Sequence, residues 1–186
     1  MASLATPRTL ISNDPVGVRE FAEQVGRVIY KPLSPGGIQE EGQHHALYAR
    51  RLLPEDCGDP SISLTAHLFQ EWVEHDHAVR MTVVDDRLFA VAIHARSEAA
   101  RVDWRSDYDA LTYEVITAPA DVRAGVRKLM TGLGLRFGAL DFLVTHDGSW
   151  TFLEINPNGQ WAWIEEVAPA IASAIADGLT RGARVK

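Results

Sequence analysis

The feature that most constrains the fold is the stretch 137–156, where two strand-like runs flank Asp147-Gly148. An Asp-Gly pair between alternating apolar residues predicts a tight two-residue hairpin turn. Strict pairing back from that turn places Asp141 directly opposite Glu154. The pairs expected between the turn and these acids are His146 with Ser149, Val144 with Thr151, and Leu143 with Phe152.

The paired acids predict a metal site. Two carboxylates that face each other across a strand pair repel, so a cation is needed to compensate them. Asn156 falls on the face of Glu154 because strand side chains alternate. We therefore expect Asp141, Glu154 and Asn156 to bind Mg²⁺, which prefers oxygen ligands. The alternative is two solvated acids on a wet surface, against which the apolar Leu143 and Phe152 of the same predicted face argue.

Composition limits the classes of protein that fit. The chain has 186 residues, of which 46% are hydrophobic, so it can form one ordinary domain or two small lobes with a real core. A net charge of -7 and the lack of a Lys/Arg-rich run argue against nucleic-acid binding. No apolar run approaches the roughly 18 residues of a membrane span, and the N-terminal residues do not resemble a secretory signal. Cys57 is the single cysteine, which excludes an internal disulfide and fits a reducing, cytoplasmic location.

The periodicity along the chain predicts an α+β fold of antiparallel hairpins with helices packed on them. Asn13-Asp14-Pro15 is typical of a helix start, with an N-cap followed by proline in the first turn. We expect residues 95–110, which are rich in charge, to form a loop. The other expected elements are helices at 15–25, 119–133 and 161–179, and strands at 28–33, 66–71, 79–84, 88–93 and 111–116.

Two segments could bind a nucleotide. Lys31 ends a strand before Gly36-Gly37, and such glycines can bring backbone N–H groups close to a phosphate while the lysine neutralises its charge. An ordinary turn with a snorkelling lysine explains the same pattern. Residues 70–73 run from a strand into a polar loop, so their backbone could bind a purine while a following acid binds ribose. A plain edge strand is the alternative.

Three further polar groups leave alternatives open. Arg80 could stabilise a transferring phosphate or pair with an acid. The segment 103–109 packs Arg105 among three acids and two aromatic residues, which suits either substrate contact or an exposed surface. His75 and His77 could share a metal, although solvated histidines are commoner.

These motifs together resemble a known superfamily. Asp141 with Glu154-Ile-Asn156, Val28-Ile-Tyr-Lys31 and Phe69-Gln-Glu-Trp-Val73 look like the ATP-grasp carboxylate–amine ligases. Three other segments resemble the ATP-grasp maturases of ribosomal peptides, the graspetide synthetases related to the microviridin ligases. These segments are Thr9 to Pro15, Asp103-Trp-Arg105 and Asn156-Pro-Asn-Gly-Gln-Trp-Ala-Trp163. The similarity runs from about residue 7 to about residue 180.

The resemblance implies an ATP-grasp fold, in which two α+β lobes with antiparallel sheets clasp the nucleotide. Residues 1–70 would be part of the central lobe, with Lys31 and the phosphate loop. Residues 71–186 would be the C-terminal lobe with the metal site. The N-terminal domain that precedes these lobes in the family would be missing.

The resemblance also implies roles for individual residues. Asp141, Glu154 and Asn156 would hold Mg²⁺ on the phosphates of ATP, while Lys31 and the loop with Gly36 and Gly37 would contact those phosphates. Arg80 and Arg105 would stabilise an acyl-phosphate step. Adenine would contact the backbone of Gln70, Glu71, Trp72 and Val73 and the side chain of Leu143, and ribose would bind Glu74, Asp76 or His77.

The implied activity is that of an ATP- and Mg²⁺-dependent ligase. It would activate Asp/Glu side chains of a ribosomal precursor peptide as acyl phosphates and form ester or amide macrocycles. The partner would be that peptide with its leader segment, and the resemblance also allows a homodimer. The alternatives are a RimK-like ligase that acts on amino acids or protein termini, and a truncated non-catalytic module that binds nucleotide or peptide.

Overall fold

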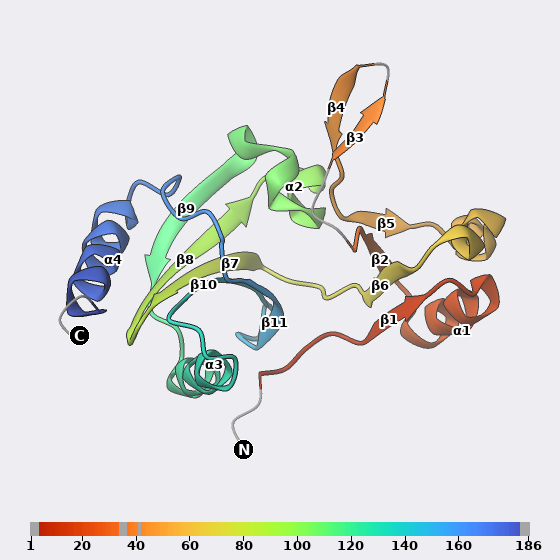
Figure 1. The fold of residues 1–186 in the computed structure, drawn as a ribbon. Coiled ribbons are helices and arrows are strands. Elements are labelled where there is room, and N and C mark those ends of the chain that lie inside the picture. Colours follow the sequence, from red (N-terminus) through yellow and green to blue (C-terminus); the bar gives the residue numbers. More distant parts are fainter. Residues whose placement is uncertain (1–3, 34–36, 41, 183–186) are drawn as a thin grey trace. The chain divides into compact units, whose positions relative to one another are not determined.

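The computed structural model describes residues 4–33, 37–40 and 42–182, without the side chains of 37–40, 43–46 and 182. The chain forms two compact units (Figure 1). The N-terminal unit comprises Pro7–Glu74 and Ala95–Ala110, and the C-terminal unit comprises the described residues up to Thr6, His75–His94 and those from Leu111 onwards. No described helix has the length and apolar character needed to cross a membrane.

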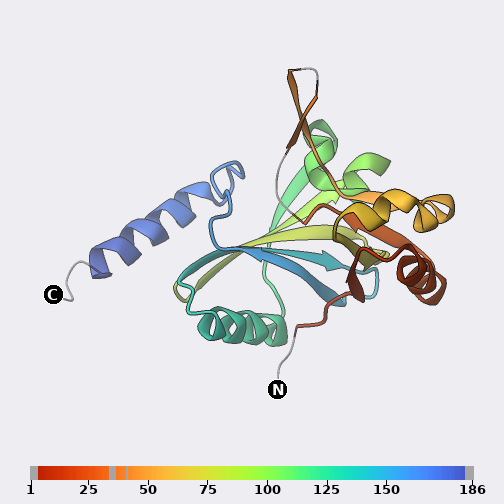
Figure 2. The same cartoon turned by 45° about the vertical axis from the view of Figure 1, so that its right-hand side comes forward.

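The C-terminal unit is built on a five-stranded sheet with a helix on each face. The strand order is β11 (Trp150–Asn156), β10 (Phe137–Val144), β7 (His77–Val84), β8 (Arg87–Ala95) and β9 (Leu111–Ile116). Helix α3 (Ala120–Gly132) covers one face, where Val126 packs with Met81, Leu140 and Phe142. Helix α4 (Ala168–Gly182) packs on the other face, where Ile171 meets Val84 and Val91 (Figures 1 and 2). We call these the α3 face and the α4 face.

The N-terminal unit has a four-stranded antiparallel sheet in the order β1 (Thr9–Ser12), β6 (His67–Glu71), β2 (Val28–Lys31) and β5 (Arg50–Leu52). Helix α1 (Pro15–Val25) buries Val18 and Phe21 against Val28 and Phe69 of this sheet. Its start confirms the predicted N-cap, because the Asp14 side chain accepts a hydrogen bond from Val16 N. A separate hairpin follows β2, formed by β3 (Gly37–Glu40) and β4 (Gln43–Ala46). Two 3₁₀ helices, Pro54–Gly58 and Pro60–Leu64, precede β6.

The loop predicted at residues 95–110 was wrong. The segment begins with helix α2 (Glu98–Val102) and continues with 3₁₀ helices Trp104–Ser106 and Tyr108–Ala110. Polar side chains start these turns: Ser97 accepts from Ala100 N, and Asp103 accepts from Arg105 N. The charged residues that suggested a loop thus include the caps of short helices.

The helix predicted at 161–179 starts later than expected, at Ala168. Residues 161–167 are mostly turns, and they bury Ile164 and Val167 on the α4 face. Trp163 stacks edge-on against Tyr113 of β9, with ring centroids 5.6 Å apart. These aromatic residues therefore extend the core of the C-terminal unit.

The hairpin of β10 and β11 has the predicted pairing at the two acids but a different pairing nearer the turn. Asp141 is paired with Glu154 as predicted. Nearer the turn the register differs by one residue, so that Phe152 faces Phe142 and not Leu143. Residues 145–149 form the connection, and a β-bulge between Asp141 and Phe142 restores the predicted register. The bulge also sends Phe152 to the α3 face, where its ring lies 5.5 Å from that of Phe142.

Candidate functional site

The α4 face carries three oxygen donors at its β10–β11 edge. Asp141 and Glu154 are opposite one another, and Asn156 is opposite Ala139, so all three share this face. Asp141 is 9% exposed, whereas Glu154 and Asn156 are exposed. Within the described part of the chain, the Glu154 carboxylate has no hydrogen-bond or ion-pair partner. A buried acid beside two accessible donors suits a divalent cation that prefers oxygen ligands.

Arg80 of β7 contacts Asp141 from the side opposite Glu154. The two residues are paired across neighbouring strands, and Arg80 Nε lies 3.2 Å from Asp141 Oδ1. Both side chains are nearly buried, with 10% and 12% exposed. Of the two alternatives for Arg80, the structure shows the pairing with an acid. The guanidinium charge balances the charge of Asp141, and a second cation could balance the charge of Glu154.

The loop after β11 folds back over the sheet beside these donors. The Asn156 side-chain oxygen accepts from Asn158 N at 2.9 Å, which turns the chain. Gly159 then approaches β10 so closely that a Cβ at this position would lie 2.3 Å from the Cβ of Ala139. Glycine is therefore required here by close packing, and it fixes the loop that begins at Asn156.

Leu143 lies on the α4 face, two residues from Asp141 on the same strand. It is half-buried and faces Ala78 of β7. Leu143 thus shares its sheet face with the oxygen donors, as the alternation along the strand predicts.

Asp76 and His77 lie elsewhere in the C-terminal unit. His77 has the parity of Val79 and Met81, which places it on the α3 side of β7. The Asp76 carboxylate accepts a hydrogen bond from His77 Nδ1 at 2.8 Å, and this bond and the charges of His77, His146 and His94 lower the pKa of Asp76 despite some desolvation. The Asp76 carboxylate is thus engaged by histidines in this structure.

The residues predicted to contact phosphate belong to the N-terminal unit. Lys31 is the last residue of β2 and is paired with Leu68. Gly37 begins β3, whereas Gly36 lies outside the described residues. Lys31 thus ends a strand, as the sequence predicts.

The segment Gln70–Val73 is less exposed than an edge strand. Strand β6 lies between β1 and β2, so Gln70 is paired on both sides, and its amide donates to Thr9 Oγ1. The backbone N–H groups of Glu71 and Trp72 donate to Arg8 O and Arg27 O.

Trp72 and Glu74 are held by arginines. The Trp72 ring is 9% exposed and is contacted by the guanidinium groups of Arg51, at 4.7 Å, and Arg27, at 5.9 Å. Hydrogen bonds from Trp72 Nε1 and from Arg27 lower the pKa of Glu74. These contacts stabilise the end of β6.

Arg105 is bound to a buried acid in the N-terminal unit. Its Nε and Nη2 donate to the two oxygens of Asp103, each at 2.8 Å, and Ala49 N donates to the same carboxylate. Burial raises the pKa of Asp103, but the hydrogen bonds and charge of Arg105, with the backbone donors, outweigh it and lower the pKa overall. Asp103 thereby fixes Arg105, of which 44% of the side chain remains exposed.

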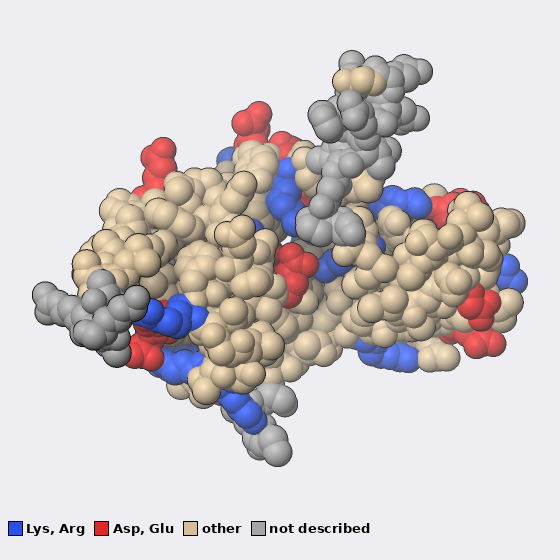
Figure 3. Space-filling model, in the orientation of Figure 1, with Lys and Arg blue, Asp and Glu red and all other residues tan. Residues whose placement is uncertain are grey.

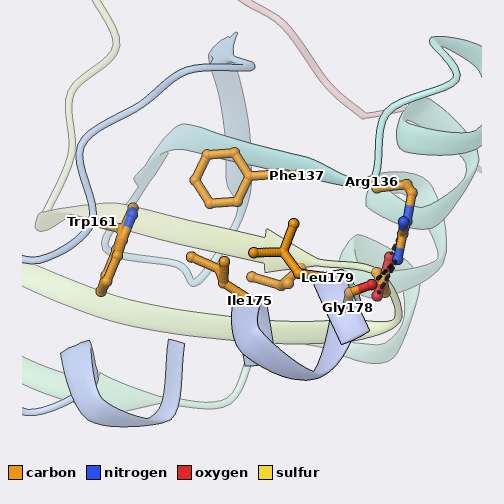
Figure 4. Close-up of a pocket in the computed structure, with 8 residues that line it drawn as sticks. Arg136, Phe137, Trp161, Ile175, Gly178 and Leu179 are labelled. Carbon is orange, nitrogen blue, oxygen red and sulfur yellow. Dashed lines mark hydrogen bonds and ion pairs between the residues drawn. The ribbon is translucent and has the colours of Figure 1, made fainter. Parts of the chain in front are cut away.

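An apolar pocket lies on the α4 face at the start of β10 (Figure 4). Phe137, Trp161, Ile175 and Leu179 surround it, and the ion pair of Arg136 with Asp85 borders it. This pocket is separate from the oxygen donors, which lie further along the sheet. Charged side chains of both signs are interspersed over the surface drawn in Figure 3.

Sequence reasoning missed two features of the polar residues. The Arg80–Asp141 pair depends on β7 and β10 being neighbours, and 60 residues of chain separate these partners, so no local pattern signals it. The second feature is the contact of His94, near the end of β8, with His77 at the start of β7. The sequence did contain a signal for this contact. Extending the pairing of the predicted strands 79–84 and 88–93 by two residues places His77 opposite His94.

The fold is similar to that of several solved ligases, although neither the protein-family models nor the curated proteins give a match. A Chryseobacterium gregarium RiPP-associated ATP-grasp ligase, in complex with ADP and a leader and core peptide, is 24% identical over 97% of this chain, with a TM-score of 0.89. The macrocyclase MdnC of Microcystis aeruginosa MRC, bound with precursor peptide MdnA, is 30% identical over 96% of this chain, with a TM-score of 0.83. The ATP-grasp ligase PsnB, complexed with a minimal precursor variant, Mg and ADP, is 25% identical over 95%, with a TM-score of 0.73.

The matched region is part of each of these ligases. The chain spans 56%, 57% and 55% of their respective lengths. Its four-stranded and five-stranded sheets and their helices agree with the α+β architecture predicted from the sequence. The chain has the ATP-grasp fold of the RiPP-associated ligases.

Proposed function

We propose that this chain is the nucleotide- and metal-binding portion of an ATP- and Mg²⁺-dependent peptide ligase. The observation that carries the proposal is the facing pair of Asp141 and Glu154, with Asn156 on the same face of the sheet. Related folds that contain ADP, Mg or precursor peptides support it. The substrate would be a ribosomal precursor peptide with a leader segment.

The proposed reaction has two steps. A carboxylate oxygen of an Asp or Glu side chain attacks the γ-phosphorus of ATP, which yields an acyl phosphate and ADP. A hydroxyl or amine of the peptide then attacks the acyl carbon, loses its proton and displaces inorganic phosphate. The product is an ester or an amide, and each new bond removes the elements of one water from the peptide.

The residues of the C-terminal unit would act mainly by electrostatics. Mg²⁺, when bound by Asp141, Glu154 and Asn156, would neutralise phosphate charge. Arg80 holds Asp141 in place through their ion pair, so its effect on the reaction would run through that carboxylate. Leu143 would offer an apolar surface to the base.

The residues of the N-terminal unit would bind nucleotide and peptide. Lys31, with the connection that contains Gly36 and Gly37, would contact the phosphates. The end of the Gln70–Val73 segment would contact adenine, with Glu74 as the ribose partner. Arg105, oriented by Asp103, would stabilise charge that develops at the acyl phosphate.

The test is turnover with a peptide that carries Asp or Glu together with Ser, Thr or Lys. We expect ATP- and Mg²⁺-dependent release of ADP, with loss of one water per bond by mass spectrometry, and no product from Glu154→Gln. Glu165→Gln removes another exposed acid of the same unit and serves as the matched control. Nucleotide binding without turnover on any peptide would show a binding module and contradict the ligase assignment.

A further inference from the structure

A second group of metal-ligating side chains lies in the C-terminal unit, on the side of the sheet opposite the three oxygen donors. Asp76, His77 and His94 each offer a ligand atom, and these atoms lie within 4.8 Å of one another. His77 precedes Ala78 on β7 and His94 follows Ile93 on β8, so the two histidines lie next to the Ala78–Ile93 pair, with ring centroids 5.1 Å apart. Neighbouring strands therefore hold the two imidazoles side by side.

Three neighbouring segments of the unit contact this cluster. Asp76 N donates to Val144 O, which attaches the acid to the end of β10. His146, from the β10–β11 connection, lies 3.4 Å from Asp76 Oδ1. Glu114 of β9 lies 3.6 Å from His94 Nε2 and can orient that ring. Three of the seven histidines of the chain thus surround one carboxylate.

The chemistry of this group differs from that of the Asp141 site. Imidazole nitrogens with one carboxylate suit Zn²⁺ and similar transition metals, whereas Mg²⁺ prefers sites made only of oxygens. In a tetrahedron with bonds of about 2.0–2.1 Å, ligand atoms are roughly 3.4 Å apart, so modest side-chain rotation brings these donors together. The side chains of Asp76, His77 and His94 are 50%, 17% and 39% exposed, which leaves a path for an ion.

We propose that Asp76, His77 and His94 bind one divalent transition metal ion of the Zn²⁺ type, with His146 as a nearby fourth donor. The ion links the start of β7, the end of β8 and the β10–β11 connection. This site is separate from the oxygen donors around Asp141, because His77 and His94 lie on the α3 side of the sheet. Its role is to stabilise this end of the C-terminal unit.

The test is titration of the metal-free chain with Zn²⁺ by calorimetry, and with Co²⁺ by visible absorption in the presence of excess Mg²⁺. We expect one ion per chain, a Co²⁺ spectrum typical of four- or five-coordination, and a rise in the melting temperature. His94→Gln should weaken binding at least tenfold, and His146→Gln should weaken it less. Asp76→Asn should also weaken binding, whereas Asp86→Asn, which removes an acid from the turn of the same hairpin, should not.

Two further variants separate this proposal from the nucleotide site. Glu154→Gln should leave Zn²⁺ binding unchanged, and His67→Gln, in the other unit, should do the same. Circular dichroism of each variant before titration shows whether the fold is retained. No saturable Zn²⁺ binding by the unaltered chain, or binding that survives in folded His94→Gln and is lost in Glu154→Gln, would overturn the proposal.

Discussion

The Arg80 guanidinium and the Asp141 carboxylate form an ion pair within the five-stranded sheet, with Nε and Oδ1 3.2 Å apart. The opposite neighbour of Asp141 is Glu154, so this one carboxylate has a cation on one side and an anion on the other. A bound divalent cation would balance Glu154 in the way that Arg80 balances Asp141. The arrangement predicts that protein stability and metal binding are coupled at this position.

Replacement of Arg80 by Met should destabilise the protein strongly. The substitution leaves the nearly buried Asp141 charge beside Glu154, and loss of one partner of a buried pair costs about 3–5 kcal/mol. Urea unfolding measures this loss. Arg87→Met is the control, because its ion pair with Asp177 is about half exposed and should contribute less than about 1 kcal/mol. Equal, small effects of the two variants would contradict a stabilising role for the Arg80 pair.

Gly159→Ala should displace the loop that begins at Asn156. The added Cβ would lie 2.3 Å from the Cβ of Ala139, so the loop must move, at a cost of about 1–3 kcal/mol. We expect weaker Mg²⁺-dependent ATP binding together with a lower melting temperature. The double variant with Ala139→Gly should recover both, because it restores the missing space.

Gly132→Ala is the matched control for this variant. Gly132 lies in α3, and an added Cβ there would have no neighbouring atom within 4 Å. Gly132→Ala should therefore stabilise the protein by about 0.5–1 kcal/mol. Full ATP affinity in Gly159→Ala would show that the loop position does not matter for the site.

Asp103→Asn should remove a stabilisation that depends on pH. The folded-state pKa of Asp103 lies below its ordinary value of 3.8, so its carboxylate stabilises the folded protein above that value. This stabilisation is lost as the pH falls from 3.8 through the folded-state pKa. The charged hydrogen bonds to Arg105 suggest a difference of about 2 kcal/mol at neutral pH.

Unfolding of the wild type and Asp103→Asn by urea, between pH 7 and about 3, measures this effect. The difference between the two proteins should be constant near neutrality and shrink at the acid end. Asp109→Asn, from the same segment, should show a much smaller difference. A gap for Asp103→Asn that grows as the pH falls would have the wrong sign.

The hairpin shows how far the sequence alone could predict the site. The Asp-Gly turn predicted a two-residue loop, whereas the connection covers residues 145–149 and shifts the pairing by one. The bulge before Phe142 cancels that shift, so the Asp141–Glu154 pair was predicted correctly but Leu143–Phe152 was not. Turn residues signal that a hairpin exists, but a bulge depends on packing that becomes defined only in the folded sheet.

Other features depended on contacts between distant segments. The start of α1 was predicted because its cap and proline are local signals. The packing of residues 95–110 was not predicted, because it depends on a distant contact: Asp103 accepts a hydrogen bond from Ala49 N, 54 residues away. The delayed start of α4 has a similar cause, since the apolar residues at 161–167 pack on the sheet without forming a helix.

The most direct test of the central claim is Mg²⁺-dependent ATP binding, measured by calorimetry on the wild type, Glu154→Gln and the control Glu165→Gln. We expect saturable binding to the wild type and to Glu165→Gln that requires Mg²⁺, with at least tenfold weaker binding in Glu154→Gln. Without ligand, Glu154→Gln should be at least as stable as the wild type, because the repulsion with Asp141 is gone. Equal Mg²⁺-dependent affinity in a folded Glu154→Gln variant, or no binding by the wild type, would contradict the assignment of this face as the metal and nucleotide site.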